Sequence, residues 1–105
     1  MASVIRESET IVSCLAGDPD LGDIVALYVA EMPERIESLR TRLAARDWAG
    51  LATCAHQLKG SAGSHGFGQI TPVAAARERA AREPRGEPEI VQAFEALVEL
   101  CSRVR

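Results

Sequence analysis

The segment from residue 90 to residue 104 repeats apolar side chains at the spacing of one face of an α-helix. The apolar positions of this segment are Ile90, Val91, Phe94, Leu97, Val98, Cys101 and Val104. Side chains three and four residues apart share a helical face, because an α-helix has about 3.6 residues per turn. Such a helix is stable only when other elements cover its apolar face. The remainder of the chain must therefore supply elements that pack against it.

A longer segment upstream has the same period and is predicted to be helical as far as Arg46. Its apolar positions are Ile24, Leu27, Tyr28, Met32, Ile36, Leu39 and Leu43. Before this segment, Asp18 can cap a helix and Pro19 suits a first helical position, so we expect helix-start chemistry there. Pro33 either kinks one continuous helix or begins a second one, because proline has no backbone N–H and clashes with the preceding turn.

Two shorter helices are predicted between these segments. Asp47 is placed to cap the first of them. The apolar stripe of that helix consists of Leu51, Ala55, Leu58 and Ala62. The second contains Ile70 and continues to Ala81, with Thr71-Pro72 in its first turn. A glycine-rich turn at residues 63–68 joins the two helices, and a turn-rich linker at residues 83–88 follows them.

These elements predict an all-α fold, an antiparallel up-down four-helix bundle with a short additional helical element at the N-terminus. Ile11, Val12 and Leu15 give that element an apolar patch, which we expect to pack across one end of the bundle. The composition agrees, since aromatic residues make up only 4% of the 105 residues and alanine supplies many apolar positions. Residues 1–9 show no period and are expected to be a frayed lead-in, which leaves residues 10–105 as one domain.

Charge and cysteine content narrow the possible functions. A net charge of −3 disfavours nucleic-acid binding, which usually needs a basic surplus. No apolar run reaches the roughly 18 to 20 residues of a membrane span and no signal sequence is evident, so we expect a cytoplasmic protein. Cys14, Cys54 and Cys101 are expected to be reduced thiols. A metal site of Cys54, His56 and His65 is disfavoured, because the first two point in different directions on a helix.

His56 lies outside the apolar stripe of its helix, about 120° from the centre of that stripe. Ala52 and Gly60 stand one turn away from it on either side, and Lys59 and Gly63 lie beside them. Each glycine inside a helix costs about 1 kcal/mol relative to alanine. Close approach of another molecule's surface to His56 is one reason for glycines to be present here despite that cost. The alternative is that the glycines only mark the end of the helix.

These residues resemble the phosphoacceptor signature of histidine-containing phosphotransfer (Hpt) domains, His-x-x-Lys-Gly followed by small residues. The matching stretch is His56-Gln57-Leu58-Lys59-Gly60-Ser61-Ala62. The resemblance covers residues 10 to 83, through Asp18-Pro19-Asp20-Leu21, residues 27–36 and Asp47-Trp48, and more loosely the last helix. It implies a free-standing Hpt protein of a bacterial two-component phosphorelay. In such a relay, Nε2 of His56 carries a phosphoryl group between Asp residues of response-regulator receiver domains.

The resemblance also implies what the partner supplies. The expected partners are receiver domains or a hybrid histidine kinase, and the receiver provides the phosphorylated Asp, its Mg²⁺ and the catalytic environment. The sequence has neither a Walker-type phosphate-binding motif nor a kinase glycine loop. We therefore expect a phosphoryl carrier, not a kinase, with no cofactor or metal of its own. A monomer is expected for a bundle with few exposed large apolar residues.

The neighbours of His56 receive predicted roles. Lys59 can offset the charge of an incoming phosphoryl group, unless it is an ordinary surface lysine. Glu78 lies eleven residues after Phe67, and His56 lies eleven residues before it. In a helical hairpin that turns near Phe67 the two face each other, so Glu78 can accept a hydrogen bond from Nδ1 and orient the ring. The alternative for Glu78 is a solvated helix charge.

The partner is expected to contact the surface around His56. The residues predicted to form that surface are Ala52, Gly60, Gly63 and Arg82. His65, the second histidine, is expected to be a surface or capping residue outside the motif.

Two other functions remain open from the sequence. One is a non-catalytic helical module that docks receiver domains without phosphotransfer. The other is an enzyme with His56 as general base, which is disfavoured because a base needs a pocket and a positioned electrophile.

Overall fold

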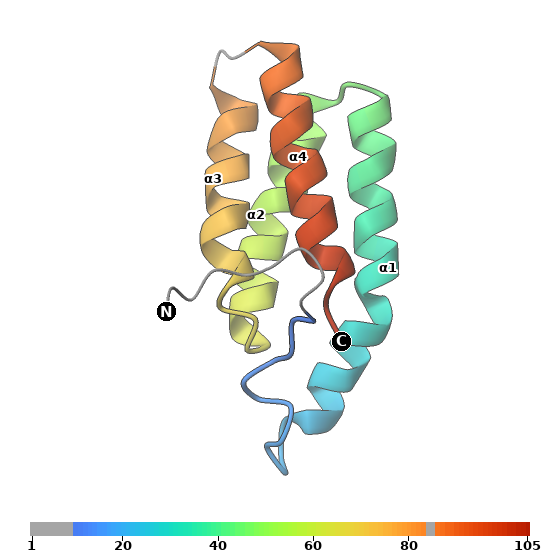
Figure 1. Cartoon of the computed structure of the whole chain (residues 1–105), viewed down its shortest axis with the longest axis vertical. Coiled ribbons are helices and arrows are strands. Elements are labelled where there is room, and N and C mark those ends of the chain that lie inside the picture. The colour runs from blue at the N-terminus through green and yellow to red at the C-terminus, as the bar shows by residue number, and fades with distance from the viewer. Residues whose placement is uncertain (1–9, 84–85) are drawn as a thin grey trace.

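The computed structural model describes residues 10–83 and 86–105, so the frayed lead-in expected at residues 1–9 lies outside the described residues. The described helices are α1 (Gly22–Ala44), α2 (Trp48–Ser64), α3 (Ile70–Arg82) and α4 (Glu87–Ser102). Successive helices run in opposite directions and pack against one another (Figure 1). The all-α antiparallel four-helix bundle predicted from the sequence is confirmed. None of these helices combines the length and the hydrophobicity that a membrane-spanning helix needs.

Helix α1 is continuous through Pro33. Of the two alternatives for this proline, the start of a second helix is therefore excluded. The helix begins at Gly22, later than the helix-start chemistry at Asp18 suggested. Oδ1 of Asp18 accepts hydrogen bonds from the backbone N–H groups of Asp20 at 2.8 Å and Leu21 at 3.0 Å. Asp18 therefore organises the turn that precedes α1, where an aspartate commonly bonds its own downstream backbone.

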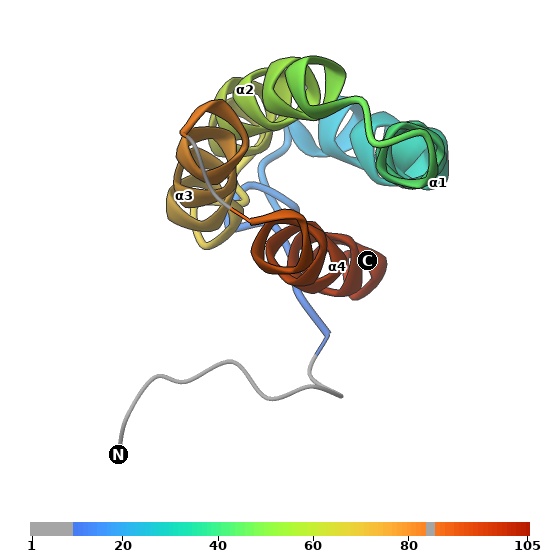
Figure 2. The same cartoon turned by 90° about the horizontal axis from the view of Figure 1, so that it is seen from above.

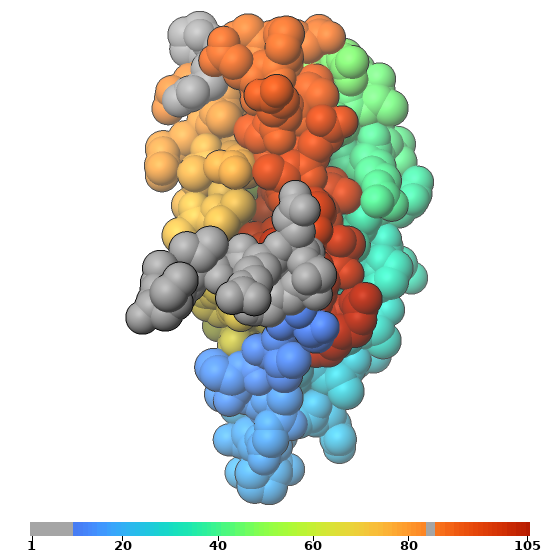
Figure 3. All heavy atoms as spheres, in the orientation of Figure 1, coloured from blue at the N-terminus to red at the C-terminus, as the bar shows by residue number. Residues whose placement is uncertain are grey.

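The prediction of a short helical element before α1 is wrong, because residues 10–21 form turns and one β-bridge. The backbone N–H of Ile11 donates to the carbonyl of Arg103 at 2.8 Å, and that of Arg105 donates to the carbonyl of Ile11 at 2.9 Å. Ile11 is buried, so this segment does pack across one end of the bundle, in extended form. The space-filling view shows it beside α1 and the end of α4 (Figure 3). Local periodicity could not reveal this pairing, which joins opposite ends of the chain.

Helices α2 and α3 pack side by side, as both ribbon views show (Figures 1 and 2). The predicted stripe of α2 is buried at all four positions, and two of these are alanines that allow close approach of a neighbouring helix. Asp47 caps α2 as predicted, since its Oδ1 accepts from the backbone N–H of Gly50 at 2.9 Å. Across the pair, Oγ1 of Thr71 donates to the carbonyl of Lys59 at 3.1 Å. This tight hairpin fixes which residues of α3 face the histidine on α2.

Candidate functional site

His56 and Glu78 face each other across the α2–α3 hairpin. Nδ1 of His56 lies 3.1 Å from Oε2 of Glu78 and 3.3 Å from Oε1. The side chain of His56 is 62% exposed, whereas that of Glu78 is only 14% exposed. No described residue hydrogen-bonds Nε2 of His56. The imidazole therefore stands in solvent with one nitrogen held by the protein and the other open.

The Glu78 carboxylate is shared by three donors. Besides the histidine, Nζ of Lys59 donates to Oε1 at 3.0 Å and Nε of Arg82 donates to Oε2 at 3.3 Å. The hydrogen bond from Lys59 is the largest cause that lowers the pKa of Glu78, to about 2. Desolvation opposes this shift, and the hydrogen bonds from His56 and Arg82 add smaller lowering contributions. Glu78 is therefore an anion at any physiological pH.

An anionic carboxylate fixes the tautomer of a neutral His56. A carboxylate without a proton can only accept hydrogen bonds, so Nδ1 carries the N–H in this contact. Nε2 then holds the lone pair of the neutral ring. The arrangement presents a nucleophilic nitrogen on the outer face of α2, where nothing from the described chain covers it.

The small residues near His56 divide into two groups. A Cβ built on Gly60 meets no atom within 4 Å, so this position leaves open space at the surface. A Cβ on Gly63 lies 3.0 Å from Oγ1 of Thr71, so Gly63 also permits the close approach of α3. Ala52 is completely buried, and the prediction that it contacts a partner is wrong. Because α3 covers that side of α2, Ala52 belongs to the helix–helix interface.

Arg82 and Lys59 both contact Glu78, one from each helix of the hairpin. The sequence placed Arg82 on the partner surface, and its side chain is 54% exposed while it bonds Glu78. The sequence placed Lys59 near the phosphoryl group, and in this structure its ammonium binds the carboxylate one helix away. Both cations thus lie beside His56, where their charges act on the same small region.

Sequence reasoning missed a cluster that joins α1 to the end of α2. The hydroxyl of Tyr28 lies 2.7 Å from Oγ of Ser61. The ring of His65 stacks on Tyr28 at 4.2 Å between centroids, and the guanidinium carbon of Arg35 lies 4.2 Å from the same ring centroid. His65 follows α2 as its C-cap residue. A tyrosine within an apolar stripe was the available signal, because a buried hydroxyl usually finds a polar partner.

The cysteines and histidines are not brought together. In the part of the chain that the structure describes, no three His, Cys, Asp or Glu side chains are grouped so as to hold a metal ion. Cys14, Cys54 and Cys101 are free thiols. Burial raises the pKa of the Cys101 thiol to about 12, which leaves it protonated and unreactive.

A comparison with protein-family models matches residues 23–105 to the Hpt domain. The chain belongs to the Hpt domain family. An Hpt domain is a histidine phosphotransfer module of a phosphorelay, a phosphoryl carrier rather than a kinase. Hpt domains typically interact with receiver domains. Comparisons with curated proteins and with solved structures gave no significant match.

Proposed function

We propose that this Hpt domain carries a phosphoryl group on Nε2 of His56 between the Asp residues of receiver domains in the cytoplasm. The observation that carries the proposal is the asymmetry of the ring. Nδ1 is held 3.1 Å from the Glu78 carboxylate, and no described residue bonds Nε2. Of the two ring nitrogens, Nε2 is therefore the one that can reach a phosphorus atom on another protein.

The transfer step follows from that geometry. The Nε2 lone pair attacks the phosphorus of a receiver's aspartyl phosphate, and an N–P bond forms. The acyl O–P bond breaks at the same time, and its electrons stay on the leaving carboxylate of the receiver. The ring keeps its Nδ1 proton and becomes a cation, which the Glu78 anion stabilises. The second transfer reverses these steps with another receiver Asp as the attacking group.

The two cations at Glu78 have separate roles in this proposal. Lys59 lies one turn from His56, so its ammonium can turn from Glu78 to an incoming phosphoryl oxygen. Arg82 stays on Glu78 through a contact within its own helix, four residues apart. The carboxylate thus keeps a cationic partner when Lys59 leaves, and it continues to hold the ring. Charge-assisted hydrogen bonds of this kind are the strong ones in proteins.

The partner completes the site. Open space at Gly60 leaves room for a receiver surface beside His56. The Mg²⁺ that such transfer requires belongs to the receiver's own site. We take residues 10–105 as the working unit, because the Ile11–Val104 bridge ties the segment before α1 to the end of α4.

The experiment is phosphoryl transfer from a panel of phosphorylated receiver domains to the wild type, His56→Gln and His65→Gln. His65→Gln is the matched control, since it removes the other imidazole and leaves His56 in place. We expect acid-labile, base-stable label on the wild type and on His65→Gln, and none on His56→Gln. If the wild type binds receivers but takes no label, the chain is a docking module without phosphotransfer. Label on His56→Gln would place the acceptor elsewhere.

A further inference from the structure

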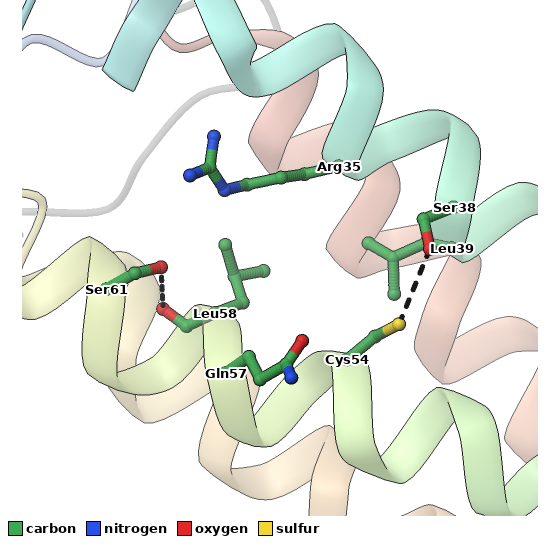
Figure 4. Close-up of a pocket in the computed structure, with 7 residues that line it drawn as sticks. All are labelled: Arg35, Ser38, Leu39, Cys54, Gln57, Leu58 and Ser61. Atoms are coloured by element: carbon green, nitrogen blue, oxygen red, sulfur yellow. Dashed lines mark hydrogen bonds between the residues drawn. The ribbon is translucent and has the colours of Figure 1, made fainter. Parts of the chain in front are cut away.

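A pocket of about 220 Å³ lies between α1 and α2 (Figure 4). Its lining residues are Arg35, Ser38, Leu39, Cys54, Gln57, Leu58 and Ser61. This volume is smaller than the roughly 300 to 1,000 Å³ of a typical small-molecule site. The pocket therefore suits one side chain better than a cofactor.

The pocket combines an apolar floor with hydrogen-bond donors. Leu39 and Leu58 are buried and form its floor. The Arg35 side chain extends from α1 over Leu58 toward Ser61, and Gln57 borders the opposite wall (Figure 4). No described residue hydrogen-bonds the Gln57 amide. Ser38 accepts from Nη1 of Arg42 at 3.1 Å, and its Oγ also lies 3.6 Å from Sγ of Cys54, so both of these pocket-lining side chains already have a partner (Figure 4).

The guanidinium of Arg35 is only partly satisfied. Its Nη2 lies 3.5 Å from Oε1 of Glu31, a long contact between neighbouring turns of α1. Its Nη1 is screened from solvent and has no hydrogen-bond partner in the described part of the chain. An enclosed donor without an acceptor is costly. The rest of the guanidinium remains reachable, because the Arg35 side chain is 33% exposed. Arg35 is also the one charged residue among the seven that line the pocket.

We propose that this pocket receives an Asp or Glu side chain of the receiver domain that docks on His56. The inference rests on the proposed function, because it names a second contact of the same complex. A guanidinium presents parallel N–H groups that match the two oxygens of a carboxylate. The stacking of Arg35 on Tyr28 holds the guanidinium in place, so little freedom is lost when the carboxylate binds.

The pocket lies on the side of α2 that a docked receiver covers. Gln57 follows His56 directly, about 100° around the helix, and Ser61 lies one turn further along the same edge. A globular domain that contacts both His56 and Gly60 therefore extends over the Gln57 edge of the pocket. A contact there adds selectivity, since a receiver without a carboxylate at that position leaves Arg35 with only its long contact to Glu31.

Glu31 gives the proposal a second, opposite test. Its carboxylate competes with an incoming carboxylate for the Arg35 fork and repels it. Glu31→Gln should therefore strengthen receiver binding, whereas Arg35→Gln should weaken it. A general loss of structure cannot produce effects of opposite sign.

The experiment measures Kd for a receiver that transfers its phosphoryl group to the wild type, by titration calorimetry at low salt. Arg40→Gln is the matched control, because Arg40 is exposed on α1 and lies outside this pocket. We expect Arg35→Gln to raise Kd about tenfold or more, Glu31→Gln to lower it several-fold, and Arg40→Gln to leave it nearly unchanged. The rate of transfer within the saturated complex should stay the same in all three variants.

Three outcomes overturn the proposal. The first is an equal Kd for Arg35→Gln and Arg40→Gln. If the wild type still transfers in that case, the phosphotransfer proposal is unaffected. The second is weaker binding by Glu31→Gln. The third is a change in self-association of the chain alone, measured by sedimentation, with Arg35→Gln, which makes a second copy the occupant. Failure of every receiver to label the wild type instead contradicts the proposed function.

Discussion

The Glu78 carboxylate lies 3.1 Å from Nδ1 of His56, although the two residues are 22 positions apart and belong to different helices. The orientation of the imidazole therefore depends on how α3 packs against α2. Small residues make that packing close: Ala52, Ala55 and Ala74 are all completely buried. The geometry of the proposed phosphoacceptor is thus a property of the hairpin and not of the His56 motif alone.

Removing the Glu78 carboxylate should slow phosphotransfer. We expect Glu78→Ala to lower the transfer rate about 10- to 100-fold, the usual cost of losing the group that orients a functional histidine. Glu78→Gln should lose less, because its amide oxygen can still accept from Nδ1. The ¹⁵N chemical shifts of His56 provide a second measurement. They should report the Nδ1–H tautomer in the wild type and a mixture of tautomers in Glu78→Ala. Unchanged shifts in Glu78→Ala would show that the carboxylate does not set the tautomer.

Lys59 and Arg82 should differ in how they act, although both bind Glu78. Replacing either with Gln should raise the pKa of Glu78 from about 2 toward its ordinary value of 4.5, which NMR titration measures. Only Lys59→Gln should also slow transfer when Glu78 is already Gln, by about tenfold, because only Lys59 is proposed to contact the phosphoryl group. If the effect of Lys59→Gln vanishes in the Glu78→Gln background, Lys59 acts through Glu78 alone.

The low pKa of Glu78 predicts a specific acid sensitivity. The folded protein keeps this carboxylate ionised down to about pH 2, while an unfolded chain protonates it near 4.5. The stabilisation is therefore complete above pH 4.5 and is lost as the pH falls toward 2. Urea unfolding of the wild type and Glu78→Gln should show a stability difference that shrinks across this interval. A stability difference that stays constant from pH 5 to pH 2 would contradict a stabilising role of the ionised Glu78 carboxylate.

The helices of this fold could be predicted because their signals are local. Asp47 caps α2, the apolar stripe of α2 is buried, and α1 follows its period from Tyr28 through Pro33. Near the start of α1 the predicted positions Ile24 and Leu27 are exposed and Val25 is buried instead. The pairing of Glu78 with His56 could also be predicted, by counting equal numbers of residues on either side of the turn. A short turn holds two antiparallel helices in one register. Helix α1 begins later than the predicted start at Asp18. An aspartate can either cap a helix or stabilise a turn, and the local sequence is compatible with both.

What could not be predicted depends on contacts between distant segments. The pairing of Ile11 with Val104 closes the bundle end with an extended segment, and no period marks it. Ala52 was placed on the exposed surface because a helical wheel shows angles around one helix, but not which side a neighbour covers. The Tyr28–His65 stack has the same origin, since it joins α1 to the residue that follows α2.

Alanine substitutions at Gly60 and Gly63 should have different effects, because a Cβ has open space at Gly60 and meets Oγ1 of Thr71 at 3.0 Å from Gly63. Gly60→Ala should stabilise the fold by about 0.5 to 1 kcal/mol through helix propensity and raise Tm by several degrees. It should also weaken transfer, since the new methyl group stands on the face that the receiver approaches. Gly63→Ala should stabilise the fold less than Gly60→Ala does, or destabilise it. The difference in stability between the two variants should become smaller when Thr71 is also replaced by Ala. Thermal unfolding and transfer assays measure both. If Gly60→Ala stabilises the fold without slowing transfer, the receiver does not need the space at Gly60.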